Sequence, residues 1–455
     1  MCRTIQHFIV LVFLLALLAP VGAVRGWSQQ ISSTSAEMLT LDQAIALALH
    51  DNPSVRQAEL EVGKSENRVA ASRTNRYPSL YAFSLAAEQF LKGDVDTTTT
   101  TQTQSVFPAV GPFFSIPVTR RPTFIFAGLI SLPLAQQYNI ALNIRQAEVA
   151  RDTAREQRRL AEQSTIDSVR QTYYGILQTQ SALESTQASI TSYRELDRLM
   201  SDRVAQQVSL KSASLDVKTR LARAEYDAIN LSNELATRKE QLNRVLGRDI
   251  RVEFRVNPTP DADGFPADLE TTRNRALDQR PEVREARLNL RHAELDRRIK
   301  KSEYIPEVTA GFTYLTFRNF DEFVPKNLAS VGLAVKWEVY DWGRKREQLA
   351  ERDKAIEQAK VRLRDTENDV LSDVSDKFRK LQQTRQALIV AQLGEETARE
   401  SLRINMNRYQ VTAALLSDVL QSQSTLAETN HQFQQALLNY WTARSELEKA
   451  LGEGN

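Results

Sequence analysis

Apolar residues recur at every seventh position in two long stretches of this sequence. The first series is Val169, Ile176, Leu183 and Ile190, and the second is Leu349, Ile356, Leu363 and Val370. A spacing of seven keeps one apolar stripe against a neighbouring helix over many turns. The pattern predicts long helices at about 140–207 and 343–410, each about 100 Å long at roughly 1.5 Å per residue. An ordinary coiled coil would show the same periodicity.

Four shorter segments break the helical pattern and partly alternate apolar with polar residues. They span about 79–90, 123–134, 307–317 and 328–339. Each has the length that a tilted strand needs to cross a bilayer. Their aromatic residues are candidates for girdles at the membrane interfaces, and these residues are Tyr81, Phe83, Phe124, Phe126, Phe312, Tyr314 and Trp337. Soluble hairpins that cap a helical bundle are the alternative.

Membrane-spanning strands in this number impose a condition on assembly. A closed barrel needs about eight strands, and a bilayer does not tolerate an open sheet edge. Four strands per chain can therefore span a membrane only if several chains share one barrel.

The two halves of the chain repeat one pattern of elements. A shift of 228 positions aligns Pro53 with Pro281, and a shift of 205 positions later aligns Gly247 with Gly452. Each copy contains a short helix, a helix that begins at proline, two strands, the long helix and a returning helix. The returning helices are expected at about 211–246 and 416–451, the copies at 41–247 and 268–452, and the linker between them at 248–267.

A longer loop in the first copy, at about 92–122, explains why the shift between the copies changes. It combines a run of threonines at 97–101 with a stretch rich in proline and aromatic residues at 107–117. An exposed loop is the simpler interpretation. An extracellular lid or surface contact is the alternative.

The first 23 residues have the pattern of a secretory signal peptide. Arg3 is followed by an apolar core at 8–18 and by small residues that end at Ala23. An uncleaved anchor is the alternative. Residues 24–40 would then be the N-terminal segment of the cleaved chain. Since the only cysteine is Cys2, cleavage would leave no residue for a disulfide or a thiolate metal site.

Composition narrows the possible classes of function. The 455 residues include 59 basic and 57 acidic side chains, so no net field attracts nucleic acid. A mean hydropathy of −0.41 excludes a protein with several membrane-spanning helices. The low count of 15 glycines suits long, uninterrupted helices. The 4 histidines are scattered and form no catalytic or metal motif, so we expect no enzyme activity, no metal and no cofactor.

Several motifs together resemble the TolC-like outer membrane efflux proteins, also called outer membrane factors. They are the duplicated Leu-x6-Ala-Leu-x3-Pro start, the prolines Pro78 and Pro306 before the first strand of each copy, the strand-to-helix turn at 337–344, the Leu-Gly helix ends at Gly247 and Gly452, and the segments 408–412 and 416–420. Each motif alone is weak. Their ordered occurrence in two copies, over about 39–452, is specific.

This resemblance implies a mainly α fold with a transmembrane β part. Three chains would form a homotrimer in which four strands from each complete a 12-stranded barrel in the outer membrane of a Gram-negative-type cell, above a periplasmic tunnel of helices. The family serves as the exit duct of tripartite efflux pumps or type I secretion systems. The implied partners are a periplasmic adaptor (membrane fusion protein), an inner-membrane transporter of the RND, ABC or MFS type, and outer-membrane lipid.

The resemblance also implies functional residues near the helical turns. Candidates for a pore constriction are Asp418, Gln421 and Asp216. Candidates for the periplasmic helix tip and for adaptor docking are Arg203, Leu210, Arg408, Tyr409, Thr412, Leu415 and Ser417. Asp418 matches an acidic constriction position of the family. The alternative is that Asp418 only stabilises the N-terminal turn of the returning helix.

A soluble periplasmic coiled-coil adaptor or scaffold protein is the second function class. Such a protein would share the signal peptide and the long helices. It would not need four membrane-length strands at the same place in both halves. The sequence leaves open which substrate is transported, and whether the duct serves efflux or secretion.

Overall fold

The computed structural model describes residues 37–87, 122–207, 210–257, 268–319, 325–411 and 413–452. The chain divides into two units, Met1–Glu37 and Met38–Asn455, and nearly all described residues belong to the second. The expected signal peptide and most of the loop at 92–122 lie outside the described residues.

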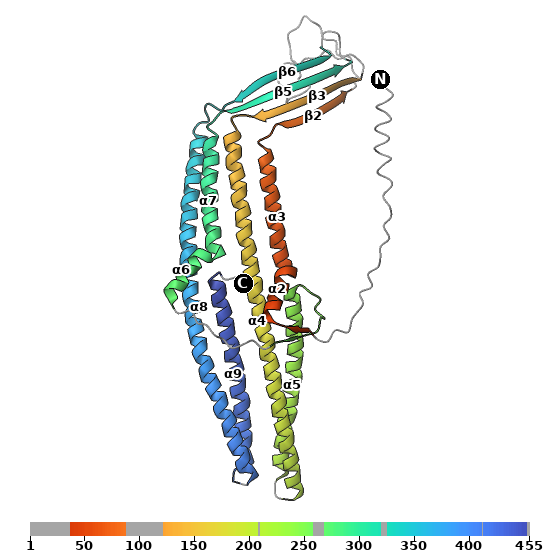
Figure 1. The fold of residues 1–455 in the computed structure, drawn as a ribbon, viewed down its shortest axis with the longest axis vertical. Coiled ribbons are helices and arrows are strands. Elements are labelled where there is room, and N and C mark those ends of the chain that lie inside the picture. The colour runs from red at the N-terminus through yellow and green to blue at the C-terminus, as the bar shows by residue number, and fades with distance from the viewer. Residues whose placement is uncertain are drawn as a thin grey trace. The chain divides into compact units, whose positions relative to one another are not determined.

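Long helices dominate the described part of the second unit (Figure 1). The helices before the linker are α2 (Leu41–Asp51), α3 (Pro53–Thr74), α4 (Gln137–Ala205) and α5 (Lys211–Leu246). Those after it are α6 (Leu269–Gln279), α7 (Pro281–Ser302), α8 (Arg344–Gln410) and α9 (Leu416–Ala450). The two long helices expected from the sevenfold spacing are confirmed, with 69 residues in α4 and 67 in α8. Among the described residues, none of the helices is both long enough and apolar enough to span a membrane.

Four antiparallel strands form the larger sheet. Their order is β2 (Ser79–Ala87), β3 (Thr123–Pro133), β5 (Glu307–Arg318) and β6 (Asn327–Lys336). A small sheet, not expected from the sequence, pairs β1 (Glu37–Leu39) with β4 (Phe254–Val256). β6 ends three residues before the expected end at 339, so Trp337 lies beyond the strand.

Side-chain caps explain where the first two helices begin. Thr40 accepts the N–H of Gln43 at 3.3 Å, and the Gln43 side chain accepts the N–H of Thr40 at 2.9 Å, which forms a capping box at α2. Asn52 accepts the N–H of Ser54 at 2.8 Å. Pro53 fits the first position of α3 because a helix needs no N–H donor there.

A glycine ends each returning helix against the junction of the two shorter helices. Gly247 has a φ of +75°, and a Cβ atom added there would lie 2.3 Å from the carbonyl oxygen of Asp51. Gly452 has a φ of +76°, and its added Cβ would lie 3.0 Å from the carbonyl oxygen of Gln279. Only glycine combines this backbone conformation with so close an approach. The same contact therefore occurs in both halves of the chain.

Two apolar cores lie where the shorter helices meet the long ones. Fully buried members of the first core include Ala44, Ala48, Val169, Ile176, Leu242 and Phe254, and those of the second include Ala276, Val283, Val374 and Ala443. Trp441 of α9 packs against both cores, and its ring stacks on Tyr174 of α4 with 5.4 Å between centroids. The two halves of the chain are therefore packed together through α4 and α9.

Candidate functional site

The register of the four-stranded sheet separates an apolar from a mixed face. Residues directly opposite each other on antiparallel strands point to the same side. Leu80 pairs with Ile130, Ile130 with Phe312, and Phe312 with Val331, so these four share one face. This apolar face is formed mainly by Leu80, Phe124, Phe126, Ile130, Phe312, Tyr314, Val331, Leu333 and Val335. The opposite face includes the polar residues Ser79, Ser131, Thr309, Thr313, Ser330 and Lys336.

The same register places the aromatic residues predicted for membrane girdles on different faces of the sheet. Those on the apolar face are Phe124, Phe126, Phe312 and Tyr314. Tyr81 and Phe83 lie on the opposite face, because they pair with Leu129 and Ala127. Trp337 follows the end of β6 and is 57% exposed. A single lipid-facing girdle therefore cannot include both Tyr81 and Phe312.

The connection from β6 to α8 is a tight turn that Asp341 holds. Its carboxylate accepts the N–H groups of Gly343 at 3.1 Å and Lys345 at 2.8 Å. Trp342 and Gly343 have φ values of +57° and +88°, in the left-handed region. The hydrogen bond from the Lys345 N–H lowers the pKa of Asp341, which keeps this carboxylate ionised and able to accept both bonds.

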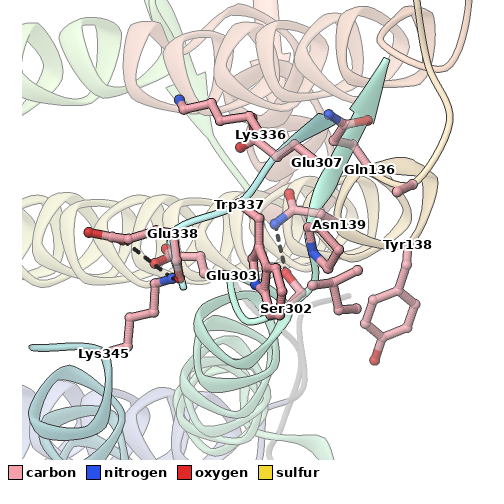
Figure 2. Close-up of a pocket in the computed structure, with 13 residues that line it drawn as sticks. Gln136, Tyr138, Asn139, Ser302, Glu303, Glu307, Lys336, Trp337, Glu338 and Lys345 are labelled. Carbon is pink, nitrogen blue, oxygen red and sulfur yellow. Dashed lines mark hydrogen bonds and ion pairs between the residues drawn. The ribbon is translucent and has the colours of Figure 1, made fainter. Parts of the chain in front are cut away.

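A cavity of about 310 Å³ lies beside this turn, between the strand ends and the helix ends (Figure 2). We call it the junction cavity. Lys345 lines it and is only 7% exposed, with Nζ 3.3 Å from Oε2 of Glu338 and 5.8 Å from the ring centroid of Tyr304. Hydrogen bonds from Arg344 and then from Lys345 lower the pKa of Glu338. Nδ2 of Asn139 donates to Oγ of Ser302 at 2.7 Å on another wall.

The long helices end in two short turns, at the tips that the sequence predicts for adaptor docking. Leu210 immediately precedes α5, and Leu415 immediately precedes α9. Their side chains are 77% and 70% exposed. The two tips therefore present the same apolar residue at matching positions.

Tyr409 of α8 links the two tips. Its hydroxyl donates to Sδ of Met200 at 3.1 Å, and Cζ of Arg203 lies 4.6 Å from the centre of its ring. Both partners belong to α4. The rest of this tip core is formed by Ile190, Tyr193, Leu196, Val217, Ala224, Val419 and Leu420. The structure thus brings Arg203 and Tyr409 together, whereas Arg408 is exposed.

The candidates for a pore constriction all lie on exposed positions near the tips. The Asp418 side chain accepts the N–H of Leu415 at 3.1 Å in the first turn of α9. Asp216 lies 3.5 Å from Arg220 on its own helix. Gln421 and Ser417 are exposed, and Thr412 lies outside the described residues. Asp418 therefore makes the local helix contact that its alternative interpretation expects, and it is also accessible from solvent.

The described part of the chain contains no cluster of three or more His, Cys, Asp or Glu side chains that could hold a metal ion.

The sequence profile of the outer membrane efflux protein family matches residues 123–248 and 272–453. The chain belongs to this family. The match covers the last three strands of the larger sheet and all four helices that form the tips. No curated protein sequence matches the chain.

Solved structures of outer membrane channels have the same fold. VceC from Vibrio cholerae matches with a TM-score of 0.72 and 16% identity, over 90% of this chain and 96% of VceC. The CmeC outer membrane channel from Campylobacter jejuni matches with a TM-score of 0.75 and 14% identity, over 94% of this chain and 90% of CmeC. The open state of the MtrE outer membrane channel from Neisseria gonorrhoeae matches with a TM-score of 0.71 and 16% identity, over 91% and 89%. Family and fold are those of channel proteins and not of enzymes.

Two features of this outer membrane efflux protein were missed by the sequence reasoning. The first is the junction cavity, because the approach of Lys345 to Glu338 depends on the geometry of the turn between them. The second is a pair of exposed apolar positions on each of two helices, Tyr226 and Ile229 on α5 and Val390 and Leu393 on α8. Their signal is in the sequence: they are apolar residues outside the stripe that packs inside the chain.

Proposed function

We propose that three copies of this chain form a passive exit duct through the outer membrane. The observation that carries the proposal is the four-stranded sheet, with an exposed apolar face and with β2 and β6 at its edges. An open edge in a bilayer leaves N–H and C=O groups without partners, so edges of neighbouring copies must pair. Three copies supply twelve strands, which is enough to close a barrel.

Exposed apolar side chains on the helices support a ring of copies. Tyr226 and Ile229 on α5 are 64% and 61% exposed, and Val390 and Leu393 on α8 are 62% and 64% exposed. The first two lie 15 and 18 positions after the start of α5, and the other two lie 20 and 17 positions before the end of α8. At 1.5 Å per residue, both pairs are about 22–30 Å from the tips.

These two surfaces are therefore at the same level and can meet between neighbouring copies. Contact between two different surfaces is head-to-tail, and such contacts close into a ring when the rotation allows. Burying four large apolar side chains at each contact favours association.

We assign the tips to a periplasmic adaptor, and the supply of substrate to an inner-membrane transporter of the RND, ABC or MFS type. The exposed residues Leu210 and Leu415 give both tips an apolar contact of the kind that a partner helix buries. The apolar face of the sheet and the family match favour this duct over a soluble adaptor or scaffold protein.

Three copies of Asp418 around one axis would favour cations and hinder anions. We expect Asp418→Ala to move the reversal potential of the reconstituted channel toward zero in a KCl gradient, and Gln421→Glu to move it in the opposite direction. Asp365→Ala, an exposed position on α8 remote from the tips, is the matched control. A reversal potential that Asp418→Ala leaves unchanged would argue for the purely local role at the start of α9.

The duct itself is tested by purifying the protein from membranes in detergent. We expect the mass of a trimer and stepwise conductance in planar bilayers. A protein that is fully soluble without detergent, or that remains monomeric and does not conduct, would contradict the proposal.

A further inference from the structure

The junction cavity holds both signs of charge within a small volume. Its charged lining residues are Glu303, Glu307, Lys336, Glu338 and Lys345. In Figure 2, Lys345 and Glu338 lie on one side of the cavity, and Gln136 and Glu307 lie on the other. Glu338 pairs with Lys345 at 3.3 Å and with Arg344 at 2.6 Å, and Glu303 pairs with Lys300 at 2.8 Å, so the wall presents balanced groups of both signs to a bound molecule. The lining therefore fits a zwitterionic ligand.

Two polar groups of the wall retain bonding capacity. The ammonium of Lys345 has three donors, and two acceptors of Glu338 lie near it, Oε2 at 3.3 Å and the carbonyl oxygen at 3.4 Å. Oε1 of Gln136 is buried and has no hydrogen-bond partner among the described groups, although Nε2 donates to Thr309 at 3.4 Å. Buried polar atoms are normally satisfied by protein, water or ligand. The cavity thus offers one donor and one acceptor to a bound molecule.

An apolar ridge of the sheet leads to the cavity. Val331, Leu333 and Val335 alternate along the apolar face of β6 and are 82%, 70% and 66% exposed. Trp337 comes next in this alternation and lines the cavity itself. From Val331 to Trp337 the ridge is about 20 Å long at the rise of an extended chain, which is comparable with an acyl chain.

We propose that the junction cavity binds the headgroup of a phospholipid that carries a phosphate and a primary ammonium, with an acyl chain along the ridge. The proposal rests on the membrane position of the sheet in the proposed function. Lys345 donates to the phosphate. Glu307 and Oε1 of Gln136 accept from the ammonium, together with Glu303, whose carboxylate also pairs with Lys300 at 2.8 Å.

The chemistry of the wall separates this headgroup from those of other lipids. A primary ammonium offers three N–H donors, as the lysine ammonium does, whereas the quaternary ammonium of choline offers none. A glycerol headgroup has no cation for Glu303 and Glu307. Trp and Tyr side chains favour the level of lipid headgroups. Trp337, which lines the cavity, is 57% exposed, and Tyr304, beside Lys345, is 47% exposed.

The test measures lipid binding by native mass spectrometry on the detergent-purified full-length protein. The probes are dioleoyl phosphatidylethanolamine, phosphatidylcholine and phosphatidylglycerol, titrated separately. Soluble glycerophosphoethanolamine in a competition arm distinguishes a free headgroup from an intact lipid. The wild type should bind phosphatidylethanolamine about tenfold more tightly than the other two lipids, the gain expected from one or two charge-assisted hydrogen bonds.

Two variants test the carboxylates and the lysine of the site separately. The double variant Glu303→Gln and Glu307→Gln should remove the preference for phosphatidylethanolamine, and Lys345→Gln should weaken binding of all three lipids. Glu396→Gln, exposed on α8 toward the tip, is the control and should change neither. Since Lys345 is buried, the double variant, at two exposed positions, keeps the test valid if Lys345→Gln fails to fold.

Equal affinities for the three lipids, or a preference that survives the double variant, would overturn the lipid site. Soluble glycerophosphoethanolamine has no acyl chain. If it displaces the lipid at an equal concentration, the cavity binds free phosphoesters, and the proposed contact of the acyl chain with the ridge is wrong. Conductance of the same samples is recorded in parallel. A conducting protein without lipid preference contradicts this inference alone, whereas a protein that neither assembles nor conducts contradicts the proposed function.

Discussion

Tyr173 connects three distant parts of the chain through one hydroxyl group. Its Oη lies 3.0 Å from the carbonyl oxygen of Leu39 and 2.8 Å from that of Asn257, and it accepts the N–H of Asn257 at 3.1 Å. Burial raises the pKa of the phenol, so the hydroxyl keeps its proton and remains a donor at neutral pH. Residues 39 and 173 are 134 positions apart, and no periodicity in the sequence indicates that they meet.

Gly247 is a residue whose role the sequence does predict, since a glycine after the last apolar position is a common helix end. We expect Gly247→Ala to lower the free energy of unfolding by about 1–3 kcal/mol, because the left-handed backbone and the close Asp51 oxygen both oppose a side chain. Chemical denaturation in detergent, followed by circular dichroism, measures the loss. Gly63→Ala is the control: nothing lies within 4 Å of its added Cβ, and it lies inside α3. There alanine should be neutral or stabilising by about 0.5–1 kcal/mol. Equal effects of the two substitutions would contradict the argument.

At the scale of elements, periodicity predicts which segments form and long-range pairing decides which way they face. The spacing of seven predicts a helix at 140–207, and the structure has one at Gln137–Ala205. Strand length predicts β2 and β3. The faces of the aromatic residues do not follow from the sequence, because register depends on the partner strand, and a slip by one residue reverses every side chain. For this reason the sequence names both Tyr81 and Phe312 as girdle candidates but does not show that they lie on opposite faces.

The assignment of faces predicts where a charge is tolerated in the sheet. Val331 lies near the middle of β6 on the apolar face, and Ser330 beside it faces the other way. If the apolar face contacts lipid, Val331→Lys should lower the stability of the vesicle-embedded protein by about 2–4 kcal/mol. Ser330→Lys should cost much less. Urea unfolding in lipid vesicles compares the two, and a larger loss for Ser330→Lys would reverse the assignment.

Two lysines on α8 and one glutamate on α9 connect these helices and make their packing depend on pH. Glu446 accepts hydrogen bonds from Nζ of Lys377 and Nζ of Lys380, both at 3.0 Å. Burial alone raises the pKa of Glu446, but the two lysine hydrogen bonds outweigh burial, and the pKa is lowered. Because the folded-state pKa is the lower one, this stabilisation is present above the pKa of an unfolded glutamate and disappears as the pH falls through the folded-state pKa.

We therefore expect Glu446→Gln to lower the free energy of unfolding by about 0.5–1 kcal/mol at neutral pH. The difference from the wild type should shrink below about pH 4. Glu357→Gln, which removes an exposed partner of Lys354, is the control and should have little effect at any pH. A difference for Glu446→Gln that stays constant down to pH 3 would contradict the ionic origin, within the range where unfolding is reversible.

At the scale of the whole molecule, packing within a single chain leaves apolar side chains exposed on the sheet and on α5 and α8. The sequence predicts that four strands need partners, because their number is too small for a barrel. It does not predict which helix surfaces meet, because the seven-residue stripe identifies only the contacts inside the chain. Tyr226 and Ile229 on α5 become recognisable as a contact surface only when their level is compared with that of Val390 and Leu393 on α8.

Cysteine crosslinking tests this pairing directly, since Cys2 is the only cysteine of the chain and lies in the expected signal peptide. We expect Ile229→Cys combined with Leu393→Cys to give covalent dimers and trimers on oxidation in membranes, because the two positions meet between neighbouring copies. Either substitution alone should leave monomers on a denaturing gel, and reduction should reverse the crosslink. The matched control combines Ile229→Cys with Val361→Cys, which is also exposed on α8 but lies 32 positions farther from the tip, about 48 Å along the helix. Crosslinking of the control pair as efficiently as the test pair, or no crosslink in either, would refute the α5–α8 contact between copies.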